Sequence, residues 1–126
     1  MKHLTNLLLV FVALFFPTTL SAQSGSETYA EATKISAEAD KKLNAAYDQL
    51  IKSIRAENEK DRAELLVARL KESQRAWLKY RDAQVAFVGM HANVGSASSR
   101  ALGMASYSAE LTKERIKDLT TVPNPF

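Results

Sequence analysis

Apolar residues recur every three or four positions through most of the chain, which is the spacing of one face of an α-helix. Between residues 28 and 121 there is no strand-like alternation and no proline, and both features indicate a helical chain. The first repeat predicts a helix from about Thr33 to Glu57. Its members are Leu43, Tyr47, Leu50, Ile51 and Ile54.

A second stripe predicts a helix from Asp61 to about Met90. Asp61 suits an N-cap, and Glu64 three residues later would complete a capping-box-like pair. The stripe is unusual because polar side chains interrupt it. Its members, at spacings of three and four, are Val67, Leu70, Gln74, Trp77, Arg81, Val85 and Val88.

The segment HANVGSASS interrupts the helical pattern, since its Gly95 and serines suit a turn followed by a fresh N-cap. A third helix then ends before Pro123, and residues 122–126 form a non-helical tail. Short connections make neighbouring helices antiparallel, so the sequence predicts an all-α, antiparallel three-helix bundle over residues 33–121. The stripe of the third helix comprises Met104, Tyr107, Ser108, Leu111, Arg115 and Leu119.

The first residues resemble a secretory signal peptide. Lys2 and His3 precede an apolar run that ends at Pro17, and cleavage after Ala22 or after Ser24 fits the small residues that follow. An uncleaved anchor is disfavoured because the run is shorter than the ~20 residues that span a bilayer. We expect a signal peptide over residues 1–22, a polar tether over 23–32, and a periplasmic or secreted protein.

Charge and cysteine content narrow the possible partners. Loss of the leader removes one of 17 basic side chains, Lys2, and leaves 16 against 14 acidic ones. Acidic and basic residues are interleaved, which is typical of a solvated helix surface and disfavours nucleic-acid binding. The chain has no cysteine, so a lipid anchor and a disulfide are both excluded.

The polar members of the second stripe have two interpretations. Pairing the first two helices about a turn near residues 59–60 places Asp40 beside Arg81 and Asn44 beside Gln74. An ion pair and a hydrogen bond would then form an internal polar seam, and breaking a buried ion pair costs ~3–5 kcal/mol. The alternative is a binding or catalytic pocket built on Trp77, Tyr80, Arg81 and Asp82.

The polar seam is the favoured interpretation, because each polar residue of the stripe has a polar partner opposite it on the first predicted helix. Tyr80 and Asp82 lie off the stripe and are better candidates for surface contacts. Beyond the leader the chain has one histidine, His91, and no metal-ligand spacing. We therefore expect no enzyme activity, no metal and no cofactor.

Three segments resemble the N-terminal domain of the family named for the lysozyme inhibitor LprI. They are DKKLNAAYDQL, QRAWLKYRD and LTKERIKDL, and the resemblance extends from Asp40, at the start of the first, to Leu119, at the end of the last. The resemblance implies an all-helical bacterial envelope protein that inhibits lysozyme. The motif residues that we carry over are Asp40, Asn44, Tyr47, Gln74, Trp77, Arg81, Thr112 and Arg115.

The chain departs from the family pattern at two positions. Where relatives have cysteines, it has Val85 and Tyr107. The resemblance implies that a disulfide joins these positions in relatives, where such a loop closure is worth roughly 3 kcal/mol. Antiparallel pairing of the second and third helices also places the two residues opposite each other, so we expect an apolar contact that partly replaces the bridge.

Two functions follow as hypotheses. The first is an inhibitor that occludes the paired-carboxylate cleft of a muramidase with the Gly/Ser loop, for which Asn93, Ser96 and Ser98 are the residues to test. The second is an envelope structural or assembly module that docks another protein through a helix face. An exposed apolar patch or self-association would favour the second hypothesis.

Overall fold

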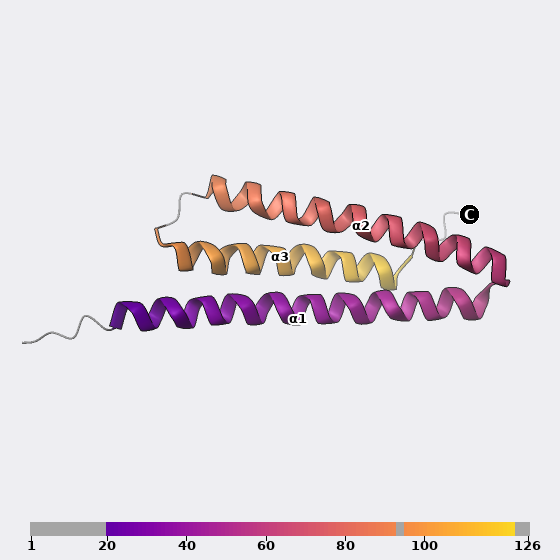
Figure 1. The fold of residues 1–126 in the computed structure, drawn as a ribbon, viewed down its shortest axis with the longest axis horizontal. Coiled ribbons are helices and arrows are strands. Elements are labelled where there is room, and N and C mark those ends of the chain that lie inside the picture. Colours follow the sequence, from indigo (N-terminus) through magenta and orange to yellow (C-terminus); the bar gives the residue numbers. More distant parts are fainter. Residues whose placement is uncertain (1–19, 93–94, 123–126) are drawn as a thin grey trace, which may run out of the picture.

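The computed structural model describes residues 20–92 and 95–122, with side chains from residue 24 onward. The elements are α1 (Leu20–Glu57), α2 (Lys60–His91) and α3 (Ala97–Thr120), and no strand occurs among the described residues. Successive helices run antiparallel (Figure 1). The all-α, antiparallel three-helix fold is confirmed. Most of the predicted signal peptide, and the tail after Val122, lie outside the described residues.

The first helix begins at Leu20, so the start predicted at Thr33 and the polar tether at 23–32 are wrong as local structure. The hydroxyls of Thr28 and Thr33 donate hydrogen bonds back to carbonyls one turn earlier, 2.7 and 2.9 Å away. Ala32 is buried, and it lines a hollow together with residues of α3. Small polar residues suggested a linker, but contact with another helix stabilises the helical state.

The core is small and lies mainly between α1 and α3. These two helices share the most extensive contact, whereas α2 approaches α1 closely only near their turn (Figure 1). α3 is therefore the main partner of α1, although the sequence pairing placed α2 in that position. The buried residues are Ala32, Leu43, Ala63, Val67, Gly89, Ala105, Thr112 and Leu119.

The turn between α1 and α2 differs from the predicted cap. Glu59 is the N-cap residue and makes no side-chain cap bond, so the proposed role of Asp61 is wrong. Glu64 is instead engaged by Arg55 of α1, whose Nε lies 3.0 Å from its Oε1. This hydrogen bond and the charge of Arg55 lower the pKa of Glu64. An ion pair across the turn thus replaces the capping box.

The connection between α2 and α3 follows the sequence prediction closely. α2 ends at His91, and Ser96 caps α3 by accepting a hydrogen bond from the Ser99 backbone N–H at 3.1 Å. Near this end the two helices approach closely at Gly89. A Cβ atom added there would lie 2.5 Å from the Met104 sulfur, so the absence of a side chain permits the contact.

Candidate functional site

Arg81 lies at the centre of a polar cluster that joins all three helices. Its Nη1 donates to Asp40 Oδ1 of α1 at 2.8 Å and to Thr112 Oγ1 of α3 at 3.4 Å. Its Nε donates to the neighbouring Asp82 at 3.1 Å. Burial lowers the pKa of Arg81, but the hydrogen bonds that it donates to Asp40 and Asp82, together with their negative charges, outweigh burial and raise the pKa overall. The predicted Asp40–Arg81 ion pair is confirmed.

The two partners of this ion pair differ in their environments. The Arg81 side chain is only 12% exposed, whereas that of Asp40 is 53% exposed. The ~3–5 kcal/mol expected from the sequence applies to a pair in which both charges are buried. Water can solvate the carboxylate here, so removal of Asp40 will cost less than that range.

Trp77 and Arg115 continue the cluster along α2 and α3. The guanidinium carbons of Arg81 and Arg115 lie 5.3 and 6.0 Å from the Trp77 ring centroid, within range of cation–π attraction. Arg115 also donates to Gln74 Oε1 at 3.1 Å and to Ser73 Oγ at 2.9 Å. The tryptophan therefore contacts cations from two helices.

The hydrogen bond predicted between Gln74 and Asn44 does not form. Gln74 turns to Arg115 instead, because a charged guanidinium is a stronger donor to an amide oxygen than a neutral amide is. The polar seam is real, but its second half joins α2 to α3. A pairing scheme restricted to the first two helices had no means of including Arg115.

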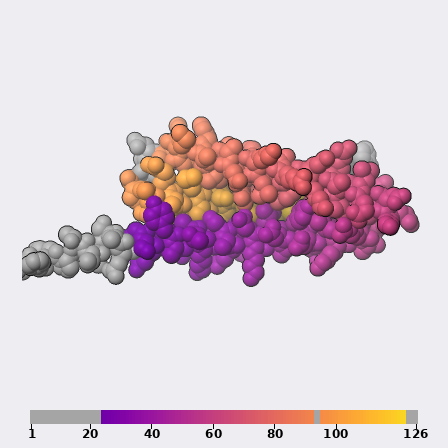
Figure 2. Space-filling model, in the orientation of Figure 1, coloured from indigo at the N-terminus to yellow at the C-terminus, as the bar shows by residue number. Residues whose placement is uncertain are grey.

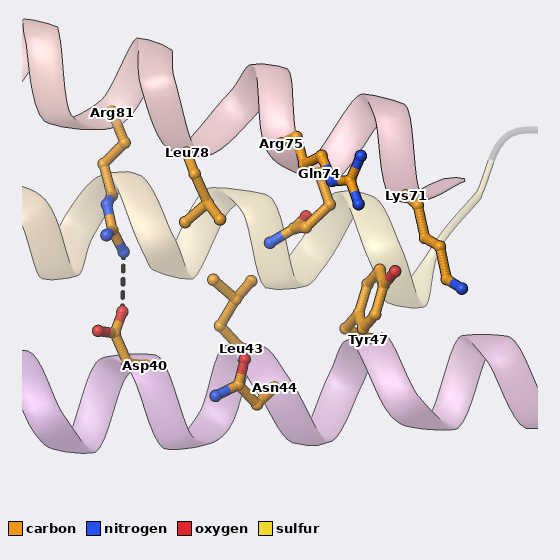
Figure 3. A pocket seen from close by; sticks show the side chains of 9 residues that line it. All are labelled: Asp40, Leu43, Asn44, Tyr47, Lys71, Gln74, Arg75, Leu78 and Arg81. Atoms are coloured by element: carbon orange, nitrogen blue, oxygen red, sulfur yellow. Dashed lines mark hydrogen bonds and ion pairs between the residues drawn. The ribbon is translucent and has the colours of Figure 1, made fainter. Parts of the chain in front are cut away.

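A groove of about 480 Å³ opens between α1 and α2 above this cluster. Figure 2 shows the furrow between the two helices with α3 visible beneath it, and Figure 3 shows the side chains that line it. The Asp40–Arg81 pair lies at one end, and Tyr47 faces Lys71 at the other. The lining residues are Asp40, Leu43, Asn44, Tyr47, Lys71, Gln74, Arg75, Leu78 and Arg81.

The predicted contact residues divide between two places. Tyr80 is 55% exposed on the side of α2, and the exposed Asp82 lies beside Arg81. Ser96 and Ser98 lie at the end of the bundle, 3.1 Å apart through their hydroxyls. Ser96 is committed to capping α3, so its hydroxyl already has a structural role. Asn93 lies outside the described residues.

Exposed apolar side chains on α2 were not singled out from the sequence. Phe87 is 63% exposed, Met90 is 88% exposed, and His91 stacks on Phe87 with ring centroids 5.9 Å apart. The seven-residue spacing from Tyr80 to Phe87 was the available signal. It was overlooked because the inner stripe of α2 explained the helix by itself.

Two features are absent from the described residues: a cluster of metal-binding side chains and a helix that could span a membrane. Within them, no group of three or more His, Cys, Asp or Glu side chains converges as a metal site would require. No helix in that part of the chain is both long and apolar enough to cross a bilayer. Three acidic residues of α3, Glu110, Glu114 and Asp118, are exposed, and Oε2 of Glu110 lies 4.0 Å from Nζ of Lys113.

The comparisons with known proteins give one match. A family model described as "Lysozyme inhibitor LprI" matches residues 19–119. No curated protein and no solved structure shows a significant match. The match includes all of α1 and α2 and all of α3 except its last residue, and it contains the whole polar cluster around Arg81.

Proposed function

Because the chain belongs to the LprI family of lysozyme inhibitors, we propose that it is an exported protein that binds a lysozyme-type muramidase and blocks its cleft. The family match carries this proposal, since it spans the three helices rather than one motif. The basic and apolar leader supports export to the periplasm or beyond the cell. The expected mode of action is occlusion, with no chemistry performed by the chain.

We assign the inhibitory contact to the end of the bundle where α2 meets α3. A muramidase cleft contains two carboxyl groups, and a projecting end that bears hydrogen-bond donors and a cation complements it. Arg100 lies in the first turn of α3, is exposed, and has no ion-pair partner among the described residues. Ser98 lies beside it, and Asn93 belongs to the same connection.

The test is inhibition of cell-wall lysis by the purified, exported protein. Animal-type, goose-type and bacterial muramidases would each be assayed at two salt concentrations. Arg100→Ala is expected to weaken inhibition at least tenfold, and inhibition should fall as salt rises. Arg75→Ala is the control, because it removes another exposed arginine, one that lines the groove between α1 and α2. Equal inhibition by both variants and the wild type would refute the assignment.

Ser96 requires a separate pair of variants because it caps α3. Ser96→Ala removes the hydroxyl and the cap together, whereas Ser96→Asp removes the hydroxyl and keeps a capping oxygen. Loss of inhibition in both variants indicates direct contact with the enzyme. Loss in the alanine variant alone indicates that the cap maintains the shape of the loop.

A docking module is the second candidate, and the exposed apolar side chains of α2 favour it. Tyr80 lies eleven residues before His91, about 16 Å along the helix, so it belongs to a different surface from the loop. A folded protein that inhibits none of the muramidases would leave this second function as the better proposal.

A further inference from the structure

A second stripe of α2 faces solvent along the C-terminal half of the helix. Its members alternate at spacings of three and four residues, and all are exposed. It is separate from the inner stripe that carries Trp77 and Arg81. Such spacing is typical of the face by which one helix packs against another, but the bundle leaves all six residues exposed, although Ser73 accepts a hydrogen bond from Arg115 of α3. The members are Ser73, Ala76, Tyr80, Ala83, Phe87 and Met90.

The order of large and small side chains in this stripe indicates what covers it. The three large residues are Tyr80, Phe87 and Met90, and the other three are small. If two copies align in parallel, large residues meet large ones and small residues meet small ones. If they align antiparallel, with Tyr80 opposite Ala83 of the second copy, every large side chain meets a small one.

The remaining pairs in that register show the same complementarity. Phe87 meets Ala76 of the second copy, and Met90 meets Ser73. The two-fold axis passes between positions 81 and 82, and every pair occurs twice. Read in the opposite direction, the stripe has small residues where the forward stripe has large ones. A surface that fits a second copy of itself in this way is what a two-fold symmetric, isologous dimer contact requires.

We propose that this exposed stripe of α2 is a self-association surface on which a second copy of the chain docks antiparallel. The charges that flank it are compatible with this contact. None of the six residues of the stripe is charged, and in the same register Lys79 of one copy lies at the height of Gln84 of the other, so no like charges meet within the seam. Asp82 of the second copy lies about two residues from the height of Lys79, near enough for an ion pair at the rim.

The contact is expected to be weak. Six side chains on one face of one helix bury less than the ~800 Å² per partner of a standard stable interface. The dimer should therefore form at high protein concentration and dissociate on dilution. Local enrichment in an envelope compartment would shift the equilibrium towards the dimer.

Two tyrosines provide a matched test of the surface. Tyr80 in the stripe is 55% exposed, and Tyr29 on α1 is 48% exposed. Sedimentation equilibrium over a hundredfold concentration range should show dimerisation of the wild type and of Tyr29→Asp. Tyr80→Asp should weaken association at least tenfold. A wild type that stays monomeric up to millimolar concentration, or a Tyr80→Asp variant that associates normally, would overturn the proposal.

Single cysteines test the orientation, and the chain has none of its own to interfere. A disulfide requires Cα atoms within about 7 Å. In the antiparallel dimer the two copies of residue 83 lie close to the two-fold axis and so close to each other. The two copies of residue 76 are separated by eleven residues along the helix, about 16 Å. Under mild oxidation Ala83→Cys should form a covalent dimer and Ala76→Cys should not.

The cross-linking outcomes separate the orientations. Cross-linking of both variants would show a parallel pair, and cross-linking of neither would show that the stripe does not self-associate. Either result refutes the antiparallel dimer. The readouts are mass and covalent linkage, so this inference stands or fails independently of muramidase inhibition.

Discussion

Removing Arg81 and removing its partner Asp40 should have unequal effects on stability. Arg81→Ala removes a side chain that is 12% exposed, with its ion pair, its bond to Thr112 and its stacking on Trp77. The hydrogen bonds of a charged group contribute ~1.5–3 kcal/mol, and the cation–π contact adds ~0.5–2 kcal/mol. We expect a total loss of ~2–5 kcal/mol in the free energy of unfolding.

Asp40→Ala should lower the free energy of unfolding much less, because Arg81 keeps Asp82 and Thr112 as partners and because the Asp40 side chain is half exposed to solvent. An exposed ion pair is worth ~0–1 kcal/mol and a buried one costs ~3–5 kcal/mol when broken. The mixed environment predicts a loss of ~0.5–1.5 kcal/mol. The variant that carries both Asp40→Ala and Arg81→Ala should therefore be only slightly less stable than Arg81→Ala alone.

The assay is urea unfolding of the four proteins, followed by helical circular dichroism. Fluorescence of Trp77, the single tryptophan, provides a second probe beside Arg81 itself. If Asp40→Ala costs as much as Arg81→Ala, the pair behaves as fully buried and the exposure argument fails. If Arg81→Ala costs less than ~1 kcal/mol, a value typical of a surface pair, the cluster does not hold the helices together.

Three further outcomes follow from local geometry. Gly89→Ala should lower stability by ~1–2 kcal/mol, although alanine has the better helix propensity, because the new methyl displaces a methionine of α3. Gly103→Ala has open space around the new methyl, so it should raise stability by ~0.5–1 kcal/mol in the same urea titration. The lowered pKa of Glu64 means that its ion pair stabilises the fold above its unfolded-state pKa of about 4.5 and that this contribution disappears as pH falls through the lower folded-state value, so Glu64→Gln should flatten the acid limb of a stability–pH curve. A Val85→Cys/Tyr107→Cys protein should oxidise to a monomeric disulfide, and failure to do so would show that the two positions are not opposite each other.

The helices and their inner faces could be predicted from the sequence because periodicity records which side of a helix is buried. Leu43 and Val67 are buried as expected, and α2 and α3 end close to the predicted residues. Periodicity does not record which helix covers a given face. That is why the sequence paired Gln74 with α1, whereas Arg115 of α3 binds it.

The Val85–Tyr107 contact stays a prediction, although the neighbouring contacts support its register. Gln84 Nε2 donates to the Tyr107 hydroxyl at 3.4 Å, and Gly89 lies against Met104. These pairs place Val85 at the height of Tyr107 on antiparallel helices. The register that a disulfide would fix in relatives is thus maintained here by a hydrogen bond and by a glycine that allows close approach.

The polar cluster also explains why α2 exposes apolar side chains on its outer face. Its buried residues are Ala63, Val67 and Gly89, near its two ends, while the middle of its inner face carries Gln74 and Arg81. That middle part is held by directional hydrogen bonds and stacking rather than by apolar burial. Tyr80 in this part of α2, and Phe87 and Met90 beyond it, lie exposed on the outer face, where a second protein surface can cover them. A helix that is fixed by polar contacts on one side is rigid enough to present an apolar stripe on the other.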